Sequence, residues 1–527
     1  MTEPQTQSTE TLPSGFDEHD DKDPSGTQEK HTQAAVVQTM PLWREILFII
    51  VISSSQLYTQ AAVGQVMSIL YVIGDTWNMP YSHLSWFLAG YCLTLGTFVI
   101  FAGRLGDMFG YKPLFMIGMT WFALWTLICG LSVYSNDVLF IFSRVFQGIG
   151  PAIVLPNGLA LLGASYAPGR RKTIAFAAFT ATGPAGNYLG ALFSGIFSRA
   201  WWPWTFFCCS MIMTGTTILA YFVIPPVPPM HRDNRPNTVR RKLIELDIPG
   251  AAAGITGLVL FNFAWNQAPL VGWEQAYVYV CLILGILFFA LYVIIDLKFA
   301  PVPLIPWKAL TLDTTFILGA LACGWASFGV WSWYCWLFVL DSRALEALIA
   351  SGYCFPIVTS GTIAALATGS LMQRVGPQVL MTAGLVAFAV GSILIATCPV
   401  GQMFWKQIFC CYVIIPWGMD LTLSSANLML SNAVALEHQG IAAGMTSTVV
   451  NYSIALGVGI GGTIESHTNR GGATAEDRLV GYRAALYFGI GLAGLGIVVS
   501  IAHSIAFRLR RKVHVTRKLE RQASLKT

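Results

Sequence analysis

The sequence is short of charge. Only 11% of its 527 residues are Asp, Glu, Lys or Arg, whereas 55% are hydrophobic and the mean hydropathy is +0.60. Water-soluble globular domains carry about 25% charged residues. So small a share of charge cannot cover a water-soluble fold, which excludes an ordinary soluble protein. A chain that faces lipid must satisfy its backbone hydrogen bonds internally, in helices or closed barrels.

Several chemical signatures are also absent. No CxxC pair occurs, and most of the eleven cysteines lie inside apolar stretches, which predicts reduced core residues and no disulfide framework. No GxxxxGK[ST] string occurs, so the chain carries no phosphate-binding loop for an ATP-driven motor. The eight histidines show no metal-binding spacing. We therefore expect no enzyme site, no cofactor, no metal and no nucleic-acid partner.

Long apolar runs dominate what is present. They are long enough for helices that cross a hydrocarbon core of about 30 Å, and too long for barrel strands. The sequence therefore predicts an all-α integral, multi-pass membrane protein with fourteen transmembrane helices. The predicted spans are residues 45–73, 84–102, 113–134, 137–163, 173–197, 205–226, 247–266, 276–298, 313–337, 347–369, 378–397, 406–432, 442–463 and 482–506.

The flanking segments and the basic residues predict the topology. Residues 1–44 are polar and acidic, which predicts a disordered tail, and residues 507–527 form a basic tail. Lys and Arg gather in alternate connections and in both tails, so the positive-inside rule predicts that both termini are cytoplasmic. A plasma-membrane location is favoured over a vacuolar one. We expect contact with membrane lipids, and a monomer.

An internal repeat divides the spans. Gly103-Arg104-Leu105 matches Gly369-Ser370-Leu371, and Asn187-Tyr188 matches Asn451-Tyr452 at nearly the same offset. Parallel repeats of this kind are typical of transporters that expose a central site to each side in turn. The predicted units are a six-helix bundle at 45–227, an inserted segment with two helices at 228–300, and a second six-helix bundle at 301–506.

A glycine-rich string lies between the second and third predicted helices. It runs from Gly103 to Lys112, and its glycines permit a tight turn. Asp107 can accept backbone hydrogen bonds at a helix start, and Lys112 is expected to face anionic head groups. The string resembles the loop signature of the major facilitator superfamily. The resemblance implies a major-facilitator fold and a gating loop that uses Gly103, Asp107, Gly110 and Lys112.

Two further motifs extend the resemblance over most of the chain. Arg144-Val-Phe-Gln147-Gly is similar to a helix 4 motif of the family, and Gly183-Pro184-Ala-Gly186 is similar to the motif of its antiporters. With fourteen spans, the chain resembles the fungal drug:proton antiporters, in particular the aminotriazole- and boron-resistance branch. The resemblance implies proton-coupled efflux of small organic or toxic compounds, as in multidrug resistance.

Two positions depart from the subgroup. The acidic residue common in helix 1 corresponds to Gln56, and Asn187 follows the antiporter motif where a glycine is usual. The departures leave proton coupling and the direction of transport open. The alternatives are a non-transporting sensor on the same scaffold, or a uniporter or importer of a small solute.

Two ionisable residues fall deep within predicted spans, where charge is costly. Arg144 lies about 10 Å into its helix with Gln147 on the same face, and the resemblance implies that this arginine tunes a neighbour's proton affinity. The alternative is an arginine that extends outward to the membrane surface. Asp420 lies about 20 Å along its helix, above Ser424 and Asn427. It is a candidate proton carrier, or a carboxyl that packs helices together.

Neutral amides complete the candidate site. Polar side chains inside a helical membrane protein line a path for a small-molecule substrate, or hold helices together by hydrogen bonds. The residues assigned to the path are Gln56, Gln60, Gln147, Asn187 and Asn451. Together with Arg144 and Asp420 for proton or charge coupling, they make the predicted site of a secondary active transporter.

Overall fold

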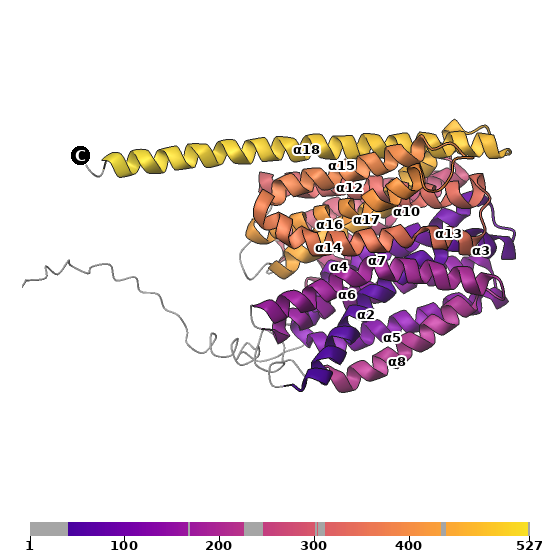
Figure 1. Cartoon of the computed structure of the whole chain (residues 1–527), viewed down its shortest axis with the longest axis horizontal. Helices are drawn as coiled ribbons and strands as arrows, with labels where there is room; N and C mark the ends of the chain where they lie inside the picture. The colour runs from indigo at the N-terminus through magenta and orange to yellow at the C-terminus, as the bar shows by residue number, and fades with distance from the viewer. Residues whose placement is uncertain are drawn as a thin grey trace, which may run out of the picture.

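The structure is a computed structural model that describes residues 40–166, 169–225, 246–300, 303, 311–433 and 439–524. Side chains are described in these ranges except at 173, 439–442 and 508–524. Helices make up nearly all of the described residues, which include no strand, and the long helices run side by side (Figure 1). The predicted all-α membrane fold is confirmed. Most of the predicted amino-terminal tail lies outside the described residues.

The elements follow one another with short connections. In the first half they are α2 (Leu42–Ser68), α3 (Leu70–Thr76), η1 (Tyr81–Ser85), α4 (Trp86–Phe109), α5 (Tyr111–Leu131), η2 (Ser132–Tyr134), α6 (Asp137–Ser165), α7 (Arg170–Ser198) and α8 (Trp204–Val223). In the second half they are α10 (Ile248–Val271), α11 (Ala276–Lys298), α12 (Leu312–Leu337), the π-helical turn η4 (Phe338–Ser342), α13 (Ala347–Tyr353), α14 (Phe355–Val375), α15 (Pro377–Ala396), α16 (Gln407–Ala433), α17 (Gln439–Thr468) and α18 (Ala475–Ser524).

Thirteen helices of the described chain are long and apolar enough to cross a membrane. The helix α7 is a further long helix, of 29 residues, whose Gly, Thr and Asn residues lower its hydropathy. It nevertheless packs along α2 within the bundle. Each of the fourteen predicted spans therefore corresponds to a helix.

The glycine-rich string is not a loop, and that part of the prediction was wrong. The helix α4 continues through Asp107 to Phe109, and α5 begins at Tyr111. Only Gly110 breaks the helix, with a φ of 96° in the region that favours glycine, and its N–H donates to the Gly106 carbonyl at 2.8 Å. One glycine accomplishes the whole reversal of direction.

The last helix is longer than predicted. It continues beyond residue 506 to Ser524 and extends past the ends of the other helices (Figure 1). After Gly496 the segment contains neither glycine nor proline and is rich in Arg, Lys and Leu, which favour helix. The basic tail predicted at 507–527 is therefore helical over its described part.

The packing of the helices repeats between the two halves. We call α2–α8 the first bundle and α12–α18 the second bundle. The contacts α2–α7, α4–α6, α5–α6 and α5–α8 recur as α12–α17, α14–α16, α15–α16 and α15–α18. The bundles meet along two seams, α4–α17 and α7–α14, and α10 packs on α11 and across the α4–α17 seam. The same pairs of helices therefore pack together in both halves of the described chain.

Candidate functional site: the interface between the bundles

The antiporter motif lies where α7 packs on α2. An added Cβ at Gly186 would lie 2.2 Å from the Leu57 carbonyl oxygen, and one at Gly190 equally close to that of Ala61. By contrast, the nearest atom to a Cβ at Gly183 is the movable Nε2 of Gln56, at 3.3 Å. Small residues that let helix backbones touch are the usual means of close packing in membranes. Gly186 is therefore required for packing, whereas Gly183 faces the predicted path residue Gln56.

Pro184 lies on the seam between the bundles. It approaches Gly361 of α14, which Pro416 of α16 also approaches. One turn further along α7, the ring of Tyr188 meets that of Phe355 edge-on, with centroids 6.0 Å apart. The antiporter motif thus brings three helices of both bundles together near the middle of the fold.

Arg144 is sealed inside the first bundle. Its side chain is fully buried, its Nε donates to the Phe87 carbonyl at 3.0 Å, and its guanidinium lies 4.7 Å above the Tyr91 ring. It also donates to Gln147, whose Nε2 donates to the Thr126 hydroxyl at 2.7 Å. This burial excludes an arginine that extends to the membrane surface. Both side chains make their contacts within the first bundle, and Gln147, predicted on the substrate path, is fully buried there.

Asp420 lies on the face of α16 that carries Pro416. The side chain is half-buried, and its Oδ2 is buried without a hydrogen-bond partner among the described residues. The same is true of Oδ1 of Asn427. The helices α14, α15, α12 and α17 cover the other sides of α16. The carboxyl therefore faces the region between the bundles, and Arg144 does not pair with it.

The neutral amides of the predicted path divide into two groups. Gln56, Gln60 and Asn187 are half-buried on the α2–α7 pair. Asn451 lies instead on the α4–α17 seam, where its Nδ2 donates to the Ser447 carbonyl at 2.9 Å and its Cβ is close to Gly96. The structure therefore places the first three near the junction at Pro184 and gives Asn451 a contact between the bundles.

The glycine-rich string forms one end of the fold, here called the motif end. Asp107 accepts a hydrogen bond from the Tyr111 hydroxyl at 2.8 Å. Lys112 donates to the last carbonyls of α8, at Tyr221 (2.9 Å) and Ile224. A cation at a helix carboxyl end is favoured by the helix dipole. The string thus fastens α4, α5 and α8 together.

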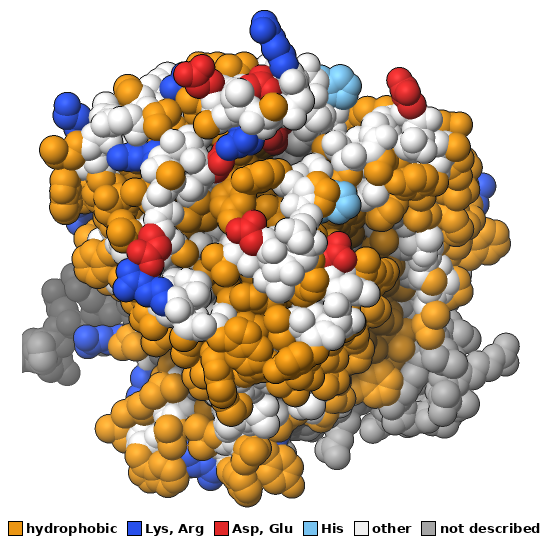
Figure 2. All heavy atoms as spheres, turned by 90° about the vertical axis from the view of Figure 1, so that its right-hand side faces the viewer, with side chains coloured by type: hydrophobic (Ala, Val, Ile, Leu, Met, Phe, Trp, Pro, Cys, Tyr) orange, Lys and Arg blue, Asp and Glu red, His pale blue; other side chains and the backbone are white. Residues whose placement is uncertain are grey.

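The opposite end of the molecule, here called the far end, carries an ion pair between the bundles. Arg199 follows α7 and binds both carboxylate oxygens of Glu346, which precedes α13, at 2.5 and 2.8 Å. Hydrogen bonding to Arg199 lowers the pKa of Glu346 below its ordinary value. Figure 2 looks onto this end, where charged side chains are interspersed with polar ones while apolar side chains dominate the flanks.

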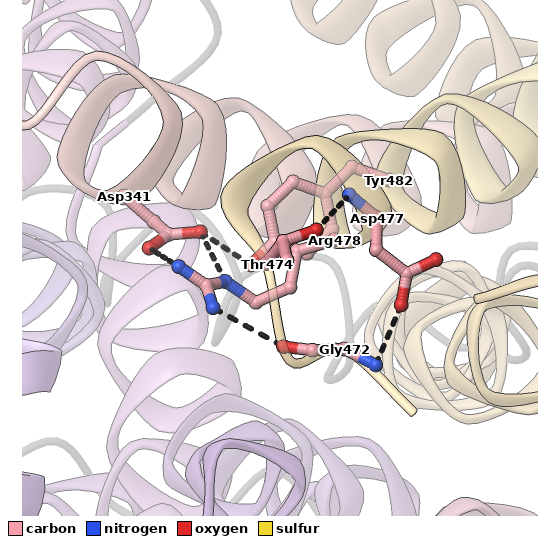
Figure 3. A network of polar contacts seen from close by, with 6 residues as sticks. All are labelled: Asp341, Gly472, Thr474, Asp477, Arg478 and Tyr482. Atoms are coloured by element: carbon pink, nitrogen blue, oxygen red, sulfur yellow. Dashed lines mark hydrogen bonds and ion pairs between the residues drawn. The ribbon is translucent and has the colours of Figure 1, made fainter. Parts of the chain in front are cut away.

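A second polar network at the far end was missed by sequence reasoning. Asp341 of η4 accepts from Arg478 at 2.9 and 2.8 Å and from the Tyr482 hydroxyl at 3.0 Å (Figure 3). The Arg478 guanidinium also lies 5.2 Å from the ring centre of Tyr81, which belongs to the first bundle. Nearby, the Tyr334 hydroxyl donates to Glu465 at 2.8 Å. Asp341 and Glu465 each lie just beyond a predicted span, which is why depth in an apolar run did not reveal them.

This arrangement of two repeated helical bundles is matched by known proteins. The family model of the Major Facilitator Superfamily matches residues 47–458. The chain belongs to this superfamily. In fold it is similar to a peptide transporter solved in complex with sulfate, with a TM-score of 0.63 at 16% identity, over 92% of this chain and 99% of that one.

Fungal relatives of this superfamily member cover nearly its whole length. The "Low affinity ammonium transporter" of Saccharomyces cerevisiae is 46% identical over 90% of this chain and 92% of its own. "Efflux pump terJ" of Aspergillus terreus is 42% identical over 92% of each chain. The "Aminotriazole resistance protein" of S. cerevisiae is 37% identical over 87% of this chain and 83% of its own. The predicted superfamily and fungal branch are confirmed.

Proposed function

We propose that this superfamily member is a proton-coupled exporter of small organic or toxic compounds. The observation that carries the proposal is the carboxyl of Asp420, which lies deep in α16 on the face that carries Pro416 and has no cationic partner among the described residues. Such a group takes up and releases protons as its surroundings change from closed to hydrated. The relatives named as an efflux pump and as a resistance protein support export.

In the proposed transport cycle the far end and the motif end of the protein close alternately. In the structure the far end is held by Arg199–Glu346 and by Arg478 against Tyr81. If the motif end is cytoplasmic, as the distribution of Lys and Arg predicts, this is a state closed to the outside. Breaking the far-end contacts would expose Asp420 to the outside, where it exchanges substrate for a proton.

Transport by purified protein in liposomes tests the proposal. With an imposed pH gradient, the wild type should move a compound from a toxin panel against that compound's concentration gradient. The pH of the liposome lumen should change at the same time as the compound moves. Asp420→Asn should abolish the coupled proton movement, whereas Asp75→Asn, at an exposed residue near the far end, should not. Substrate movement by Asp420→Asn with unchanged proton flux would contradict the assignment.

A second candidate is uptake of a small solute. It is favoured by the relative that is 46% identical and is named as a low-affinity ammonium transporter. The two candidates predict opposite effects of gene deletion on cellular content of the transported compound. Deletion of an exporter raises the cellular content of its compound, whereas deletion of an importer lowers it.

A further inference from the structure

One face of α16 looks across to the first bundle. This face carries Pro416, Asp420 and Asn427. In a helix of 3.6 residues per turn, Asp420 and Asn427 lie four and eleven positions after Pro416, and are therefore rotated from it about the helix axis by only about 40° and 20°. Pro416 approaches Gly361 beside Pro184 of α7, which fixes the direction of the face. The half-buried Leu423 lies between the two polar residues on it.

Two hydrogen-bond acceptors on this face lack donors. Oδ2 of Asp420 and Oδ1 of Asn427 are both buried and have no partner among the described residues. A buried acceptor without a partner costs about 1–3 kcal/mol. When Asp420 is ionised, neither oxygen can supply its own hydrogen, in contrast to a serine or threonine hydroxyl, which can donate to a helix carbonyl. The missing donors must therefore come from water or from a bound molecule.

The charge of Asp420 limits which kind of molecule can supply the missing donors. Asp420 has no salt bridge within the described chain, and the contacts of Arg144, the deep cation, all lie within the first bundle. A cationic donor would satisfy the carboxylate in both charge and hydrogen bonding. The two acceptors are seven residues apart, or about 10 Å along the helix at 1.5 Å per residue, with the apolar Leu423 between them.

We propose that this face binds an extended organic amine. A protonated nitrogen is held at Asp420, an apolar spacer lies over Leu423, and a second N–H donor binds Asn427. The proposal rests on the proposed function and names the substrate class of the same site. Because a proton and the amine compete for one carboxyl, binding of the amine displaces the proton that export requires.

Binding to the purified full chain in lipid nanodiscs, measured by calorimetry, tests this proposal without any gradient. The probes are an eight-carbon diamine, the monoamine of the same length and the matching primary alcohol. The wild type should bind the diamine most tightly and the alcohol most weakly. Asp420→Asn should weaken both amines at least tenfold and leave the alcohol unchanged, whereas Asp75→Asn should change nothing.

Asn427→Ala separates the two ends of the site. It should weaken the diamine by about 10- to 150-fold, the equivalent of one hydrogen bond from a charged donor, and leave the monoamine unchanged. Equal affinity of the wild type for alcohol and amines, or amine affinity that survives Asp420→Asn, would overturn the proposal. If Asp420→Asn does not fold, the series of probes on the wild type and Asn427→Ala still decides. Amine binding without proton-coupled transport would instead contradict only the proposed function.

Discussion

Replacing Gly186 by alanine should increase the distance between the backbones of α2 and α7. The added Cβ would lie 2.2 Å from the Leu57 carbonyl oxygen, whereas ordinary contact begins at 3.4 Å. The backbones must therefore separate by about the difference, 1.2 Å, because a carbonyl within a helix cannot turn aside. The contact is between backbone atoms, so no side-chain rotamer relieves it.

The magnitude follows from two opposing terms. Alanine in a helix gains about 1 kcal/mol over glycine, and overpacking costs about 1–3 kcal/mol, with a backbone clash at the upper end. The expected net loss for Gly186→Ala is about 1–2 kcal/mol, a roughly 5- to 30-fold shift in the folded to unfolded ratio. The assay is thermal unfolding of the purified protein in detergent, together with transport in liposomes.

Matched glycines make the prediction sharp. An added Cβ at Gly163 of α6 meets nothing within 4 Å, so Gly163→Ala should be neutral or stabilising. Gly183→Ala of the same motif meets the mobile end of Gln56 and, at 4.0 Å, the side chain of Gln60, and should leave stability close to that of the wild type. If Gly186→Ala is as stable as Gly163→Ala, the reasoning that this glycine acts through packing is refuted.

Three other perturbations have definite outcomes. Arg199→Glu should make the far end accessible to a thiol reagent, and the double variant with Glu346→Arg should be protected from the reagent again. Because Arg199 lowers the pKa of Glu346, the wild-type ion pair should persist at neutral pH and weaken only below the ordinary glutamate pKa of about 4.3. A double variant as open as the single one would argue against a specific pair. Asp341→Asn, which strands the mostly buried Arg478, should cost about 2 kcal/mol in thermal unfolding, and an unchanged midpoint would contradict the network. Arg144→Met leaves the buried amide oxygen of Gln147 without this donor, so it should cost about 1–3 kcal/mol in thermal unfolding and lose transport. Full activity in liposomes would remove Arg144 from the coupling mechanism.

Part of the candidate site was readable along the chain. Arg144 and Asp420 stand out in sequence because an ionised side chain in an apolar run is expensive wherever the run folds. The antiporter motif is likewise visible from the spacing of its glycines and proline. What spacing could not show is that Gly186 contacts a backbone while Gly183 faces Gln56, since that depends on how α7 is rotated against α2.

Composition and local pattern alone predicted that the chain is a helical membrane protein, where its long helices lie and that they repeat. These properties can be predicted from the sequence because unpaired backbone groups are costly in lipid, so each segment must form its backbone hydrogen bonds within its own helix. Only the tertiary structure decided which polar residues face one another. Gln147 turned inward to Arg144, Lys112 turned to the end of α8, and Asp341 met Arg478 from a segment 137 residues away. These pairings depend on rotation and crossing of helices far apart in sequence, which no local signal specifies.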